Sequence, residues 1–205
     1  MGYSAREEFL NTASHLLAAA VFCAAGAWLA TRANALGLGA FKTMSVVVFY
    51  ASAVFAFLAS ALYHGARGAA KYKLKLLDHI AIFFMSFGVF FVAAALSELP
   101  KSITIALSAL LFLAAVAGSW LKIKMGADGT KKWSLIFNVA MPSFIIIPMF
   151  YMPAKAVMFF ALAAALDLIG LAFYLKKDAE FTHAIWHIFS TLTVAGDTLA
   201  VYCML

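Results

Sequence analysis

The sequence has little charge and few cysteines, and both shortages limit what the chain can be. Only 12% of its 205 residues are charged, whereas 66% are hydrophobic and the mean hydropathy is +0.98. Soluble domains carry about 25% charged and about 45–50% apolar residues. A soluble core cannot absorb this much apolar surface, so most of the chain must face lipid. The sequence therefore predicts a polytopic integral membrane protein.

The two cysteines exclude a disulfide framework. Cys23 and Cys203 both lie inside apolar stretches and form no CxxC motif. We interpret them as buried free thiols. Acidic residues are also scarce, with nine Asp and Glu against 15 Lys and Arg. Membrane topology and anionic lipid explain the resulting charge of +6, so it does not require a nucleic-acid partner.

Seven apolar stretches are long enough to cross a bilayer, which needs about 20 residues. Charged residues, Gly or Pro bound each stretch, and the connections are short. Pro142 and Pro148 fall within the fifth stretch and are expected to kink it. We find no internal repeat. The prediction is one all-α membrane domain over residues 1–205, a bundle of seven transmembrane helices at 9–31, 41–63, 74–97, 102–121, 133–151, 156–175 and 183–205.

Lysine and arginine collect on one side of this predicted bundle. That side carries Arg6, Arg67, Lys71, Lys73, Lys75, Lys122, Lys124, Lys131, Lys132, Lys176 and Lys177. The other side carries Arg32, Lys42, Lys101 and Lys155. Cytoplasmic loops of membrane proteins are enriched in Lys and Arg. We therefore expect a cytoplasmic N-terminus and an external C-terminus.

Polar side chains inside the predicted helices are the main functional signal. His183 and His187 begin the last stretch, and their spacing of four places both on one helix face. His64 ends the second stretch on the same predicted side of the membrane. Such positions are costly for polar groups unless these are paired, line a cavity or hold a metal. Three imidazoles from two helices suit Zn²⁺, which binds histidine nitrogen and keeps an open position in catalytic sites.

Two further residues are expected to act with this zinc site. Asp78 begins the third stretch on the same side, where its carboxylate could serve as a general base toward water. Ser60 lies one helical turn before His64. Simpler explanations stay open, since His64 could be interfacial, Asp78 could interact with its helix N-terminus, and Ser60 could bond a carbonyl one turn earlier. His79 points about 100° away from Asp78 on a helix and is expected to pack.

Other polar residues extend the pattern beyond these five positions. Three of them begin the first stretch on the same side, and two acids lie deeper in the sixth and seventh stretches. Asp197 is expected about 15 Å deeper than His187, from ten residues at helical rise. A water-filled cavity or an ion pathway would account for such acids, and so would protonated carboxyls hydrogen-bonded between helices. The additional candidates are Glu8, Asn11, His15, Asp167 and Asp197.

Taken together, these motifs resemble the signature of the hemolysin III family. The matching segments are Ser60-Ala-Leu-Tyr-His64, Leu77-Asp78-His79 and His183-Ala-Ile-Trp-His187, and Glu8-x-x-Asn11-x-x-x-His15 resembles the first-span motif of the bacterial branch. The family is grouped with the progestin and adipoQ receptors, which include the adiponectin receptors. The resemblance implies an intracellular N-terminus and an inner-leaflet zinc site with ligands His64, His183 and His187, beside Asp78 and Ser60. It also implies the bacterial cytoplasmic membrane as the location.

Three functions are compatible with this resemblance. The wider superfamily includes alkaline ceramidases, which favours a zinc-dependent hydrolase of a lipid amide at the cytoplasmic leaflet. The alternative is a non-enzymatic signalling or membrane-homeostasis protein with structural zinc, in which the cytolysis of the family name is indirect. An ion or proton pathway ranks third. We expect membrane lipid as substrate or ligand, and neither nucleic acid nor a large extracellular protein as partner, because the predicted outer loops are short.

Overall fold

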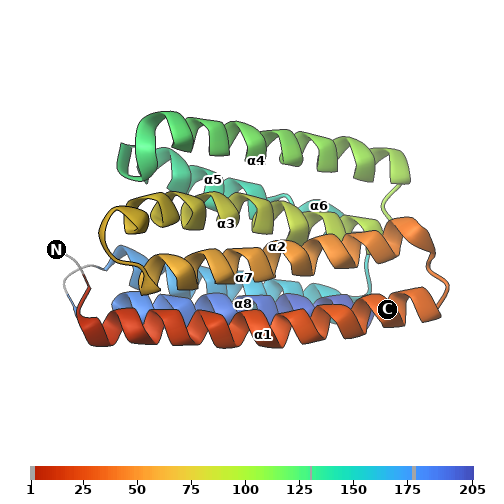
Figure 1. Cartoon of the computed structure of the whole chain (residues 1–205). Helices are drawn as coiled ribbons and strands as arrows, with labels where there is room; N and C mark the ends of the chain where they lie inside the picture. The colour runs from red at the N-terminus through yellow and green to blue at the C-terminus, as the bar shows by residue number, and fades with distance from the viewer. Residues whose placement is uncertain (1–2, 130, 177–178) are drawn as a thin grey trace.

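The computed structural model describes residues 3–129, 131–176 and 179–205, and every regular element within these ranges is an α-helix. The helices lie side by side in one bundle, and α1 begins at the opposite end from the one where α8 ends (Figure 1). The elements are α1 (Ala5–Ala35), α2 (Gly39–Gly65), α3 (Gly68–Leu96), α4 (Lys101–Gly129), α5 (Lys131–Ser143), α6 (Ile146–Met149), α7 (Ala154–Leu175) and α8 (Thr182–Met204).

Six of the described helices are long and apolar enough to cross a membrane, namely α1, α2, α3, α4, α7 and α8. This confirms the all-α class and the multi-pass membrane character that the sequence predicts. The fifth predicted stretch, 133–151, is divided, because α5 ends at Ser143 and α6 begins at Ile146. Pro142 lacks a backbone N–H and so weakens the helix there. α5 and α6 together still follow the length of the bundle (Figure 1).

The start of α1 is fixed by its own sequence. Ser4 precedes the helix, and its Oγ accepts the Glu7 N–H at 3.3 Å, while Glu7 Oε2 accepts the Ser4 N–H at 2.8 Å. This reciprocal pair satisfies two of the N–H groups that a helix start leaves without partners. At its other end α1 turns into α2 through Gly37 and Gly39, whose φ angles of +67° and +83° favour glycine. The capped first turn of α1 therefore has a defined position, on which the site below depends.

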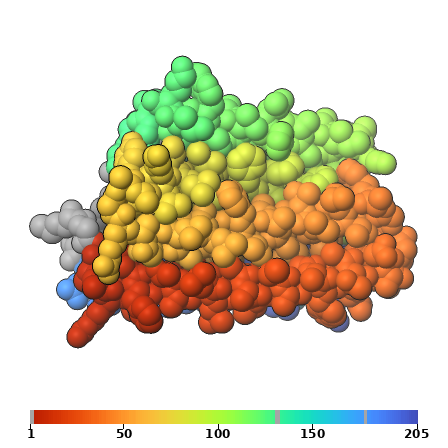
Figure 2. Space-filling model, in the orientation of Figure 1, coloured from red at the N-terminus to blue at the C-terminus, as the bar shows by residue number. Residues whose placement is uncertain are grey.

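The helix surfaces divide into an apolar exterior and a close-packed interior. Figure 2 shows one face of the molecule, on which α1, α2, α3 and α4 lie in order. Large apolar side chains such as Phe9 (70% exposed) point outward, as expected for contact with lipid. Inside, α7 approaches α8 so closely that a Cβ at Gly170 would lie 2.7 Å from Phe189 Cβ. Cys23 and Cys203 are free, as predicted, but neither is buried, since Cys23 is exposed on the apolar exterior and Cys203 is half-buried.

The basic side chains segregate to the two ends of the bundle as predicted. Helices α1, α3 and α8 begin at one end, where α2 and α4 finish, and Arg6, Lys71, Lys75 and Lys122 belong to this end. Of the other residues assigned to that side, Lys177 lies outside the described residues, as do the side chains of Lys131 and Lys132. The opposite end carries Arg32, Lys42, Lys101 and Lys155. The end of the bundle at which α1 begins carries most of the basic residues and is called the basic end below.

Candidate metal centre

Three histidines from two helices converge at the basic end. His64 lies in the last turn of α2, and His183 and His187 lie in the first turns of α8. His183 Nε2 is 3.2 Å from His64 Nε2 and 3.1 Å from His187 Nε2. One ring nitrogen from each residue lies within 4.8 Å of the other two. His64 is 2% exposed and His187 is fully buried, so the cluster is largely removed from solvent.

This arrangement has the geometry of a metal site. A tetrahedral ion with metal–nitrogen distances of about 2.0–2.1 Å places its ligand nitrogens about 3.3 Å apart. The measured contacts of 3.1 and 3.2 Å are close to that separation. Three neutral imidazoles carry one N–H each, so nitrogens that face one another in this way are well suited to share a cation. The donor set of three histidines fits Zn²⁺ and other borderline metals.

Two rings from the N-terminal part of the chain stack on histidines of the cluster. His15 on α1 stacks on His187 with a centroid separation of 3.7 Å and an interplanar angle of 6°. Tyr3, just before α1, stacks on His183 at 4.6 Å and 23°. Burial raises the pKa of the Tyr3 phenol above its ordinary value, so this ring stays neutral. The rings therefore restrict how the two imidazoles of α8 can rotate.

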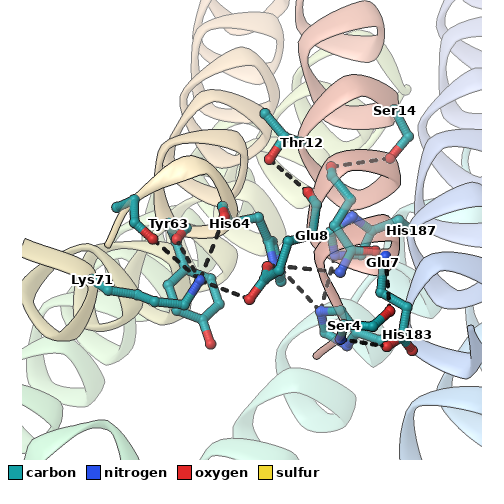
Figure 3. Close-up of polar contacts among 12 residues, drawn as sticks. Ser4, Glu7, Glu8, Thr12, Ser14, Tyr63, His64, Lys71, His183 and His187 are labelled. Carbon is teal, nitrogen blue, oxygen red and sulfur yellow. Dashed lines mark hydrogen bonds and ion pairs between the residues drawn. The ribbon is translucent and has the colours of Figure 1, made fainter. Parts of the chain in front are cut away.

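Two further residues of α1 meet His64. Glu8 Oε2 is 2.6 Å from His64 Nδ1, and Asn11 Nδ2 is 3.4 Å from the same nitrogen. Figure 3 shows Glu8 between His64 and Lys71, whose ammonium donates to Glu8 Oε1 at 2.7 Å. The structure thus brings all three predicted residues of the first stretch, Glu8, Asn11 and His15, to the histidine cluster.

Asp78 and Ser60 form a neighbouring polar pair. The Asp78 carboxyl on α3 lies next to the Ser60 hydroxyl and within electrostatic reach of the Lys122 ammonium. Both residues are buried, at 8% and 3% exposure. Ser60 Oγ makes no hydrogen bond of good geometry within the described chain, and no hydrogen bond there joins Asp78 to the three clustered histidines. Ser60 lies one helical turn before His64 on α2, and the catalytic roles of Asp78 and Ser60 stay predictions.

The remaining predicted polar residues lie apart from the cluster. The His79 ring faces α4, where its Nδ1 is 3.0 Å from Lys122 Nζ, in line with the expected packing role. Asp197 is buried on α8 near Tyr50, ten residues beyond His187 and so about 15 Å along the helix. Asp167 is half-buried on α7. Neither acid joins the histidines, and the predicted ion pathway is untested.

Sequence reasoning missed several residues of the site. The sequence indicates Lys71 only as a loop charge and assigns no role to Tyr3 or Glu7. Glu7 Oε1 accepts the N–H of Phe181 at 2.9 Å, immediately before α8. Phe181 has a left-handed φ of +62°, which is uncommon for a bulky residue. The Ser4-x-x-Glu7 capping pattern in the sequence indicates a role for Glu7 at the start of α1. The contact of Glu7 with Phe181 joins segments far apart in the sequence, and no sequence pattern predicts it.

A comparison with known protein families covers most of the chain. A family model described as haemolysin-III related matches residues 3–197. The matched range contains all three clustered histidines together with Glu8, Ser60 and Asp78.

Proposed function

This chain belongs to the haemolysin-III related family, a family of the progestin and adipoQ receptor type, and from that premise we propose that it is a zinc-dependent hydrolase of a membrane-lipid amide. The observation that carries the proposal is the convergence of three histidines. The Nε2 atom of His183 lies 3.2 Å from that of His64 and 3.1 Å from that of His187. Ser60 lies one helical turn before His64 and next to Asp78, so a buried hydroxyl and a buried carboxyl are candidates to take part in amide hydrolysis. The metal ligands, the identity of the ion and the reaction are all parts of this proposal.

The proposed mechanism assigns a task to each side chain. Bound Zn²⁺ would polarise the acyl carbonyl and make water more acidic. Asp78 takes a proton from the attacking water, whose oxygen bonds to the acyl carbon. The carbon–nitrogen bond then breaks, and Asp78 returns the proton to the leaving amine. Ser60 Oγ, which makes no hydrogen bond of good geometry in the described chain, is free to donate one to the carbonyl oxygen of the substrate.

The proposed topology has seven crossings, with the N-terminus in the cytoplasm. α5 and α6 serve together as the fifth crossing, since they follow the length of the bundle from the end of α4 to the start of α7 (Figure 1). The basic end then faces the cytoplasm, as the distribution of Lys and Arg indicates. The histidine cluster would meet lipids of the inner leaflet of a bacterial cytoplasmic membrane, whose anionic head groups the basic end attracts.

Metal analysis of the detergent-purified protein tests this proposal first. We expect about one zinc per chain in the parent, as three histidines and an open position imply. His187→Ala should lose the metal. The matched control is His79→Ala, which removes a histidine from the same end of the bundle without touching the cluster. Zinc-loaded parent should release free amine from a lipid amide. A folded parent that contains no metal contradicts the proposal.

The packing of α2 and α8 favours a second function, that of a signalling or membrane-homeostasis protein with a structural metal. These two helices make little backbone contact with each other, and the clustered histidines connect them directly at the basic end. An ion held there would join them, as expected of a structural metal in a signalling or membrane-homeostasis protein. Zinc-loaded parent that cleaves no lipid amide, yet depends on zinc for its stability, would favour this function over the hydrolase.

A further inference from the structure

We propose that Glu8, held by Lys71, is the positioning residue that fixes His64 as a metal ligand. The inference rests on the proposed metal site and adds to it a carboxylate from α1 and a lysine from α3. It starts from one short contact, the 2.6 Å between Glu8 Oε2 and His64 Nδ1. The His64 side chain is fully buried, whereas that of Glu8 is 20% exposed, so the contact lies at the edge of the site.

The contact with Glu8 decides which nitrogen of His64 is free to bind a cation. A carboxylate only accepts hydrogen bonds, so Nδ1 must carry the proton that it shares with Glu8. The neutral ring then has its lone pair on Nε2, the atom that faces His183 Nε2 at 3.2 Å. Histidines that bind metals commonly donate their other N–H to a carboxylate in this way, which fixes both tautomer and ring orientation.

Asn11 competes for the same nitrogen and makes the contact with Glu8 necessary. The Asn11 amide nitrogen lies 3.4 Å from His64 Nδ1, and an amide N–H could donate only if Nδ1 carried no proton. That tautomer would place the proton on Nε2 and so block the metal position. The shorter, charge-assisted contact to Glu8 is the stronger of the two and selects the tautomer that can bind metal.

Lys71 holds the Glu8 carboxylate in place. Its Nζ donates to Glu8 Oε1 at 2.7 Å and lies 3.3 Å from Tyr63 O, 3.4 Å from His64 O and 3.4 Å from Ala66 O. The lysine thereby satisfies carbonyls that the end of α2 leaves open and turns the other carboxylate oxygen toward His64. Figure 3 shows this sequence of contacts, from Lys71 through Glu8 to His64.

His64 is the only one of the three clustered histidines with a carboxylate hydrogen bond in the described part of the chain. His183 and His187 are restrained by ring stacking on Tyr3 and His15. Removing the carboxylate should therefore affect one ligand and leave the other two in place. Weakened metal affinity is the expected result, and complete loss of metal is not.

The test compares zinc affinities by competition with a chelator of known affinity. Glu8→Gln keeps the shape of the side chain but removes its charge, and we expect zinc binding weaker by about 10- to 100-fold. Lys71→Met leaves the Glu8–His64 contact but frees the carboxylate to move, so its loss should be smaller. Asp128→Asn is the matched control, because it breaks a Lys–carboxylate pair at the same end, with Lys75 at 2.8 Å, and touches no clustered histidine. Its zinc affinity should equal that of the parent.

Cobalt substitution separates positioning from simple stabilisation. The visible spectrum of bound Co²⁺ reports on ligand geometry, and Glu8→Gln should change it while Asp128→Asn should not. Equal zinc affinity and an identical cobalt spectrum in Glu8→Gln and parent would overturn the inference, even if Glu8→Gln melts at a lower temperature. A parent that binds neither metal would overturn the proposed function itself. If Glu8→Gln does not fold, Lys71→Met decides by the same two measurements.

Discussion

His64 meets a carboxylate at one ring nitrogen, whereas the rings of His183 and His187 stack on Tyr3 and His15. The Nδ1 of His64 meets Glu8 at 2.6 Å and its Nε2 meets His183 at 3.2 Å. His187 instead lies flat against His15 at 3.7 Å between ring centroids. Hydrogen bonds fix the tautomer of an imidazole, and stacking fixes only the plane of the ring. Substitutions near His64 should therefore act on metal affinity more strongly than substitutions of the stacked rings.

At the residue scale, Asp78 provides the sharpest test of the hydrolase. Asp78→Asn should keep zinc, because no hydrogen bond in the described chain joins Asp78 to the clustered histidines. Turnover of a lipid amide should fall by about 10²- to 10⁴-fold, the usual contribution of a general base. Metal content and released amine, measured on the same preparation, check both expectations.

Asp197→Asn is the matched control for this experiment, since it replaces another buried acid that lies far along α8. It should leave turnover close to that of the parent. Full activity in Asp78→Asn would remove Asp78 from the mechanism, and equal losses in both variants would indicate a general effect of neutralising buried acids.

The site residues that could be predicted from the sequence are those that lie on one helix four residues apart. His183 and His187 are four residues apart, and Ser60 and His64 share the same spacing, so helix geometry places each pair on one face. Lys71 and Tyr3 could not be predicted in the same way. Their contacts with Glu8 and His183 depend on how α1 lies against α3 and α8, and hydrophobic periodicity does not determine packing between helices.

At the scale of elements, the first turn of α1 holds the start of α8. Glu7 accepts the Ser4 N–H with one carboxylate oxygen and the Phe181 N–H with the other, at 2.8 and 2.9 Å. Glu7→Gln offers one accepting oxygen in place of two, so one of these hydrogen bonds must be lost. We expect a loss of about 1 kcal/mol, comparable to loss of a helix cap. Amide hydrogen exchange in residues 179–187 should become faster.

Glu98→Gln is the control for the α1–α8 contact, since Glu98 is an exposed acid at the opposite end of the bundle. Its exchange profile in residues 179–187 should match that of the parent. Unchanged exchange in Glu7→Gln would show that Phe181 keeps its left-handed conformation without help from α1.

The division between α5 and α6 shows where sequence patterns stop being informative at this scale. The apolar length of 133–151 predicted one crossing, and Pro142 with Pro148 predicted a kink within it. The structure interrupts the helix directly after Pro142, where α5 ends at Ser143 and α6 begins at Ile146. Hydropathy measures the length of an apolar segment, whereas the position of a break also depends on which neighbouring helices satisfy the freed backbone groups.

At the scale of the whole molecule, the proposed metal ties two parts of the bundle together. α1 packs closely on α2 and α2 on α3, α7 packs closely on α8, and the histidines connect α2 directly with α8 at the basic end. Zinc present at 100 times its dissociation constant would stabilise the fold by about 2.7 kcal/mol. Complete chelation should lower the melting temperature of the parent accordingly. The melting temperature of His187→Ala should be the same with and without chelator. An equally unchanged melting temperature in the parent would contradict a stabilising metal.

Orientation in the membrane is the last prediction, and it decides which leaflet the site serves. Counting Lys and Arg placed every histidine in the same half of the bundle, and the structure brings α1, α2, α3 and α8 together at that end. Lys73 is exposed at the basic end and Lys101 at the other. In a chain with both native cysteines replaced, a membrane-impermeant maleimide should label Lys101→Cys in intact cells and Lys73→Cys only after permeabilisation. Labelling of Lys73→Cys alone in intact cells would place the histidines at the outer face, where the substrate would have to come from the opposite leaflet.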